Sequence, residues 1–301
     1  MITVETSHPT ECGMRNAECG MQNPMSRITN HASRPTPHAP RSSLAFTLLE
    51  LLMVIAIMGI LAAIALPTIR GLKPNAKVAA TRQLLDAVGR ARQLAVSQRT
   101  TVYMVFVPAS FWTDPAYAYA SWTTNDQTAA ESLLDKQLIG YAYVCLRSVG
   151  DQPGMHTPRY LSSWKTLPQG AFIPQGKFGP GLTIPNTALG TLSIPAFKTA
   201  NNIPFPSETT LPVAGARPYI ALPYIAFNGT GQLVSGQSGQ PELIPVSEGG
   251  VIFARDPNTK VAQAQPPQAN EVPPGNTIDN YSLVYIDRLT GRAHVERRKV
   301  Q

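Results

Sequence analysis

The chain has 301 residues, of which 43% are hydrophobic and 14% are charged. This apolar content excludes an intrinsically disordered protein, and the length suffices for one or two domains with a buried core. The formal net charge of +7 permits an acidic partner such as DNA or an anionic membrane surface, but it does not select one. The 28 prolines and 22 glycines predict short strands and long loops beyond any helix.

Residues 1–45 form a polar leader that we expect to be disordered and removed. The leader has no hydrophobic periodicity, so it cannot bury enough apolar surface to offset its ordering entropy. Cys12 and Cys19 lie inside it, and their spacing does not fit the short C-x-x-C pattern of zinc or redox sites. A trimmed chain would keep Cys145 as its single thiol. Translation from Met25 instead of Met1 is an open alternative.

The dominant feature follows the leader and runs from Leu48 to Leu66, with the sequence LLELLMVIAIMGILAAIAL. Glu50 is its single charge. With its flanks, the run approaches the ~20 residues that a helix needs to cross a bilayer. We therefore expect a transmembrane and assembly helix over residues 46–67. A buried helix of a soluble protein is the alternative, but such helices rarely stay apolar on every face for so long.

Beyond Pro67 the composition changes, and residues 68–99 predict an amphipathic continuation of the helix. Val78, Leu85 and Val88 recur at helical spacings, together with Ala95, and polar side chains fill the other positions. The apolar stripe should pack on whatever follows. Because proline removes a helical hydrogen bond, we expect a kink near Pro67.

The remaining residues, 100–301, predict a β-rich head. Segments rich in β-branched and aromatic residues are typical of strands, and they occur at residues 101–107, 139–146, 219–227, 250–254 and 281–286. Glycine turns at residues 228–231 and 290–291 suit hairpins. Residues 150–215 are rich in proline and predict a loop. The expected fold class is α+β, with a long N-terminal helix, its first half transmembrane, packed on an antiparallel head.

The acidic residue in the apolar run needs a physical explanation. A charge at the centre of a membrane span costs roughly 3 kcal/mol on insertion scales. The cost becomes understandable if the chain is cut between Ala45 and Phe46. The new α-amino group then lies within about a helical turn of Glu50, or of Glu50 in a neighbouring copy, and the two charges neutralise one another. Requiring that partner from a neighbour would also set the register between subunits.

The segment from Ala45 to Glu50 closely resembles the cleavage and methylation motif of type IV pilins and type II secretion pseudopilins. In that family a polar leader precedes a small residue, then Phe, Thr, an aliphatic pair and Glu, then a long apolar helix that commonly contains a kinking proline. The match here is Ala45, Phe46, Thr47, the aliphatic pair Leu48–Leu49, Glu50 and then Pro67. The chain departs from the pattern in having Ala45 where glycine is usual and in placing Arg41, its basic residue, a few positions from the cut.

The resemblance implies cleavage after Ala45 by a prepilin peptidase, N-methylation of Phe46 and a role for Glu50 as the assembly carboxylate. It implies a single-pass protein of the inner membrane, with its head outside the cytoplasm, that joins a filament after assembly. The implied partners are the peptidase, other pilins or pseudopilins, a membrane assembly platform and the lipid bilayer. No cofactor or metal is implied, and the expected role is structural, not enzymatic.

Two segments of the head resemble hairpins near the end of minor pseudopilins of the H type. They are Phe227–Gly231 and Ile286–Arg292. Short hairpins with glycine turns are common, so this resemblance is less specific than the N-terminal one. Secretion, surface attachment and DNA uptake all remain open as the purpose of the filament.

Other interpretations predict different observations. An ordinary signal peptide would use Arg41 as its basic flank and the A-x-A pattern Ala63–Ala65, which gives a mature chain that starts at Leu66. A membrane-tethered enzyme would need a catalytic or metal-ligating set, but after trimming only His156 and His294 remain, with no such set near them in sequence.

Nucleic-acid binding is compatible with the filament interpretation. The C-terminus is basic, and its candidate phosphate contacts are Arg292, Arg297, Arg298 and Lys299. A solvated charged end is the more common explanation of such a run.

Overall fold

The computed structural model describes residues 47–71, 76–117, 121–148, 150–152, 155–186, 190–215, 217–236 and 239–297. The leader of residues 1–45 lies outside them. The chain forms two compact units, and the division between them falls between Ala62 and Ala63.

Helix α1 runs from Leu48 to Gly71 and is continuous through Pro67. Every side chain from Thr47 to Leu61 is exposed. Within the described residues, no helix is both long enough and apolar enough to cross a membrane. The expected span over residues 46–67 begins before the first described residue and continues past Leu61, into residues whose side chains lie outside the description. The link to the next helix, residues 72–75, also lies outside it.

Helix α2 runs from Ala76 to Gln98, inside the range predicted as an amphipathic helix, but its buried face differs from the predicted one. Val88 and Ala95 are buried as expected, whereas Val78 and Leu85 are only half-buried. The centre of the buried face consists mainly of small residues: Ala80, Thr81, Leu84, Ala87 and Ala91. Small side chains let the strands approach the helix axis closely.

The head contains a six-stranded antiparallel sheet in the order β3-β2-β1-β9-β8, with β4 also paired to β2. Its strands are β1 (Val102–Phe106), β2 (Gly140–Cys145), β3 (Arg159–Tyr160), β4 (Lys165–Thr166), β8 (Lys198–Ala200) and β9 (Leu222–Phe227). The register places Val102 between Cys145 of β2 and Phe227 of β9. The start of β1 and the ends of its two neighbours therefore lie in one row.

A second, five-stranded antiparallel sheet has the order β11-β10-β12-β13, with β5 also paired to β10. Its strands are β5 (Ala171–Phe172), β10 (Glu242–Ile252), β11 (Gln268–Glu271), β12 (Ser282–Ile286) and β13 (Ala293–Arg297). A separate hairpin pairs β6 (Leu182–Asn186) with β7 (Gly190–Ile194). The short helices are η1 (Phe111–Thr113), α3 (Thr124–Glu131), η3 (Gln175–Phe178) and α4 (Asn276–Asp279).

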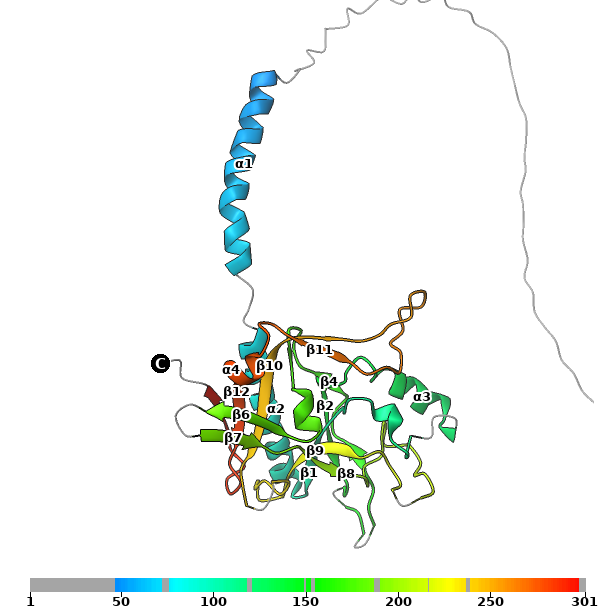
Figure 1. Ribbon diagram of the computed structural model, residues 1–301. Helices are drawn as coiled ribbons and strands as arrows, with labels where there is room; N and C mark the ends of the chain where they lie inside the picture. Colours follow the sequence, from blue (N-terminus) through cyan, green and yellow to red (C-terminus); the bar gives the residue numbers. More distant parts are fainter. Residues whose placement is uncertain are drawn as a thin grey trace, which may run out of the picture. The chain divides into compact units, whose positions relative to one another are not determined.

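Helix α2 packs against strands of both large sheets (Figure 1). The main hydrophobic core consists of buried side chains from the helix and from these strands. Strand β1 divides its side chains by alternation, as a strand with two covered faces should. Met104 and Phe106 join the core on α2, whereas Val105 and Val107 join a second core with Phe111 and the aromatic residues around it. The two cores explain why the central strands read as almost continuous apolar runs.

The α+β fold class is confirmed, with a helix packed on antiparallel sheets. Strands β1, β2, β9 and β12 lie where the sequence predicts strands. Of the strand predicted at residues 250–254, only residues 250–252 are extended, and they form the end of the longer β10. The loop prediction for residues 150–215 is wrong, because β3 to β8 all lie there. These strands are only two to five residues long, and apart from the hairpin of β6 and β7 each pairs with a longer strand outside this segment.

Candidate functional site

The start of α1 is built by Thr47, the residue before the first helical position. The Thr47 carbonyl accepts hydrogen bonds from the N–H groups of Glu50 (3.0 Å) and Leu51 (3.2 Å), and its hydroxyl accepts a further one from the Glu50 N–H (3.2 Å). Thr47 is thus the N-cap of α1, and Thr47–Glu50 has the T-x-x-E spacing of a capping box. Ala45 and Phe46 lie outside the described residues.

Glu50 lies in the first turn of this helix, where a carboxylate is favourable because it faces the positive end of the helix dipole. It is the single charged side chain between Thr47 and Leu61, and all its neighbours on the helix are exposed apolar residues. Leu48 is 81% and Leu49 77% exposed, and exposure continues around every face to Leu61. An apolar surface of this extent is typical of a helix that has a lipid or protein partner.

Near its C-terminal end, helix α2 contacts the two glycine turns of the head, at residues 228–231 and 290–291. The Arg92 Nε–H donates to the carbonyl of Thr290 (2.8 Å) and also lies 3.2 Å from the carbonyl of Gly231. The turns touch each other, because a Cβ added to Gly291, whose φ is 62°, would collide with the Gly231 carbonyl oxygen. Both segments noted in the sequence therefore meet at one place, with an arginine of α2 between them.

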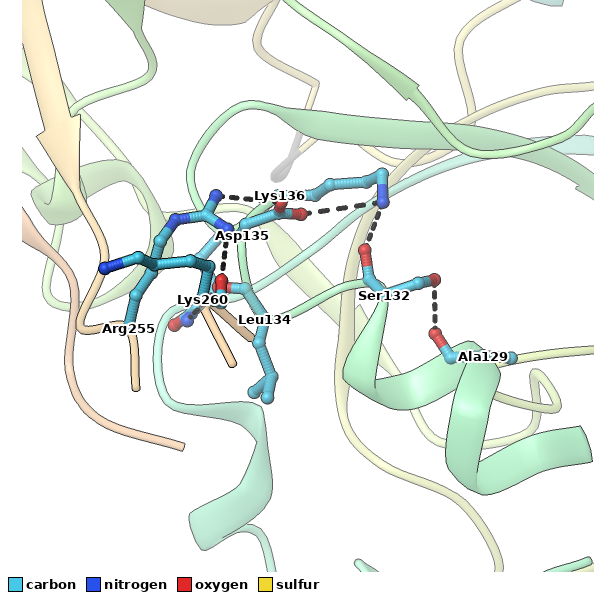
Figure 2. Close-up of polar contacts among 8 residues, drawn as sticks. Ala129, Ser132, Leu134, Asp135, Lys136, Arg255 and Lys260 are labelled. Atoms are coloured by element: carbon cyan, nitrogen blue, oxygen red, sulfur yellow. Dashed lines mark hydrogen bonds and ion pairs between the residues drawn. The ribbon is translucent and has the colours of Figure 1, made fainter. Parts of the chain in front are cut away.

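A further polar cluster joins the segment after α3 to the loop between β10 and β11 (Figure 2). The Arg255 Nη2 lies 3.2 Å from Asp135 Oδ2, and the Arg255 Nη1–H donates to the Lys260 carbonyl (3.0 Å). Lys136 contacts the other oxygen of Asp135 at 3.6 Å. These side chains are partly exposed to solvent, which screens their charges, so their effect on stability is small.

Two of the four candidate nucleic-acid contacts, Arg292 and Arg297, lie among the described residues. Arg292 directly precedes β13 and Arg297 ends it, so the two exposed side chains lie at opposite ends of a five-residue strand. Arg298 and Lys299 lie outside the described residues. The described part of the chain holds no group of three or more His, Cys, Asp or Glu side chains that would suit a metal ion.

Comparison with protein-family models gives one match, to the prokaryotic N-terminal methylation motif, over residues 40–66. The chain therefore carries the N-terminal motif of type IV pilins and pseudopilins. The match covers the cut position expected between Ala45 and Phe46, Glu50 and the whole apolar run from Leu48 to Leu66. No curated protein and no solved structure matches the chain.

The motif implies a membrane-anchored, pilin-like protein that is processed by a prepilin peptidase. It does not specify the filament system, and it does not show the H-type subgroup. Pilins of this family are typically structural proteins without enzymatic activity.

Two residues of this site did not emerge from the sequence. Thr47 was matched to the motif but not recognised as an N-cap, although its T-x-x-E spacing to Glu50 is a readable signal. Arg92 is one of the polar residues of α2, and its bond to the Thr290 carbonyl depends on how distant turns pack. No local signal in the sequence indicates such a contact.

Proposed function

We propose that this chain is a structural, non-enzymatic subunit, a pilin or minor pseudopilin, of a type IV pilus-like or type II secretion filament. It is cut between Ala45 and Phe46, N-methylated on Phe46 and assembled through α1. The observation that carries the proposal is the methylation motif on a helix whose exposed surface is apolar on every face and contains one carboxylate, that of Glu50.

The helix start adds a physical reason for Glu50. Cleavage leaves the α-amino group of Phe46 one residue before the N-cap Thr47, next to the positive end of the helix dipole. A cation is unfavourable there, and the carboxylate of Glu50 in the first turn offsets it. When the cation and carboxylate come from neighbouring copies, the same pairing fixes the register of one α1 against the next. The partners in this assembly are other pilins, the assembly platform and the bilayer that holds α1 before assembly.

Pro67 lies inside α1 and is proposed to let the helix bend where the apolar run ends. A place in the H-type subgroup and a role in DNA uptake through Arg292, Arg297, Arg298 and Lys299 both stay predictions.

The proposal is tested by replacing Glu50 with Gln in cells that make the filament. The matched control is Asp86→Asn, which removes one exposed carboxylate from α2 and leaves the apolar helix unchanged. We expect Glu50→Gln protein to be processed and inserted but absent from sheared filaments, and Asp86→Asn protein to assemble normally. Filaments containing Glu50→Gln protein at the wild-type level would contradict the role of the carboxylate.

A further inference from the structure

A cleft of about 750 Å³ lies at the end of the head next to the C-terminus of α2, which we call the distal end. Its lining includes Arg99, Tyr103, Arg147, His156, Asn202 and Gly229. Because α2 has 23 residues, this end lies about 33 Å along the helix from Ala76, the end nearest α1 in the chain. Nothing in the methylation motif accounts for a cleft here.

Arg99 holds a backbone conformation that its position does not favour. Helix α2 ends in a Schellman motif, in which the Thr100 N–H donates to the Ala95 carbonyl and the Arg99 N–H to the Val96 carbonyl, both at 3.3 Å. Arg99 is the residue after the cap and has φ 49°, a left-handed conformation that glycine adopts at little cost and other residues do not. A strained residue that lines a cleft points to a functional use of its side chain.

The charges in the cleft are arranged to receive an anion. Arg99 and Arg147 are exposed, and neither guanidinium has a hydrogen-bond or ion-pair partner among the described residues. The Thr100 hydroxyl donates to the Arg147 carbonyl (3.3 Å), which links the segments that carry the two arginines. Asp151, the one carboxylate among the described residues of the lining, already accepts hydrogen bonds from the backbone N–H groups of Ser148 (2.8 Å) and Thr157 (3.3 Å). The guanidinium groups are therefore left for a ligand.

We propose that the distal cleft binds an acidic polypeptide segment, whose carboxylates pair with Arg99 and Arg147. Guanidinium groups match carboxylates with two parallel hydrogen bonds, and the cleft has the size of a site for a short peptide or a drug-sized molecule. Single-stranded nucleic acid needs a series of rings on which bases stack. Among the described residues of the lining, Tyr103 is the one tyrosine, phenylalanine or tryptophan, and its ring already packs on Tyr224, with centroids 5.3 Å apart.

The test measures fluorescence anisotropy of a labelled deca-glutamate peptide with the full-length protein in neutral detergent. The cleft variant is Arg99→Gln with Arg147→Gln. The matched control is Arg82→Gln with Arg90→Gln, which removes the same charge from exposed positions of α2 outside the cleft. We expect the cleft variant to bind about tenfold or more weakly than wild type, and the control variant to bind within about twofold.

A second variant, Arg99→Gly, separates binding from folding. Glycine suits the left-handed position, so Tm should rise by about 2–4 °C while the affinity for the peptide falls. If Arg99 had only a structural role, its replacement would change Tm without lowering the affinity for the peptide. An unchanged affinity would therefore overturn the proposal.

Three other results would also overturn it. Wild-type protein that does not bind the peptide has no such site, and equal losses in the cleft and control variants indicate only long-range net charge. Tighter, Arg99-dependent binding of a labelled dT10 oligonucleotide, or of inorganic phosphate as a competitor, assigns the cleft to nucleic acid or to a small anion. None of these measurements requires filament assembly, so the proposal fails or stands independently of the filament role.

Discussion

Replacing Gly291 by alanine should destabilise the head by about 3 kcal/mol. The φ of 62° alone costs a residue with a Cβ about 1 kcal/mol. The new methyl group would also collide with the Gly231 carbonyl oxygen and lie 3.2 Å from the Phe227 ring, so the turn must move. Movement of the turn forfeits the Arg92 hydrogen bond to Thr290, a charge-assisted bond that contributes about 1.5–3 kcal/mol.

Thermal unfolding of the full-length protein in mild detergent, followed by circular dichroism, measures this effect. For a head of this size, 3 kcal/mol corresponds to a fall in Tm of about 6–12 °C. The matched control is Gly89→Ala, because Gly89 lies inside α2 and a Cβ there would meet no atom within 4 Å. That substitution should stabilise the protein by about 0.5–1 kcal/mol. If both variants had the wild-type Tm, the contact between the two turns would not exist as described.

Further predictions concern buried charges. Burial by itself would raise the pKa of Asp126, but hydrogen bonds from the hydroxyls of Ser207, Thr123 and Thr210 outweigh it and hold the pKa below its ordinary value. The stability that Asp126 contributes is therefore present above a pH of about 3.9 and is lost as the pH falls through the lower folded-state pKa. The Asp126→Asn variant should unfold at a lower denaturant concentration than wild type at pH 7, and the difference should shrink in acid. A difference in denaturant midpoint that stays constant across this pH range would contradict the hydroxyl network. Lys177 forms a buried ion pair with Glu242, and Lys177→Met should cost about 3–5 kcal/mol in urea unfolding because it leaves Glu242 buried without its partner. The double variant Lys177→Met with Glu242→Met should recover most of that loss, and a double variant as unstable as the single one would refute this account.

The sequence predicts those parts of the fold that depend on local patterns. The segments that form β1 and β2 are rich in β-branched and aromatic residues, so their composition alone predicts strands. The short strands β3, β4, β5 and β8 have no such pattern, since each pairs with a strand outside its own segment of the chain. The buried face of α2 differs from the predicted face for a related reason. Alanines such as Ala87 and Ala91 carry little hydrophobic signal, yet they are buried where strands press closely on the helix.

The candidate site divides in the same way. The motif around Glu50 is readable because it is one contiguous string of residues with a physical reason for its carboxylate. The distal cleft cannot be predicted from the sequence, since Arg99 and Arg147 lie 48 positions apart in the chain and come to line one cleft through the pairing of β1 with β2. Arg99 could not be singled out from the sequence either, because its unusual φ is a property of the folded helix end.

The most direct measurement is the mass of the N-terminal peptide of protein purified from membranes. A peptide that begins with N-methylated Phe46 is the predicted result. A peptide that retains residues of the polar leader, or a mature chain that starts at Leu66, would contradict the account, because Glu50 would then have no α-amino group to pair with.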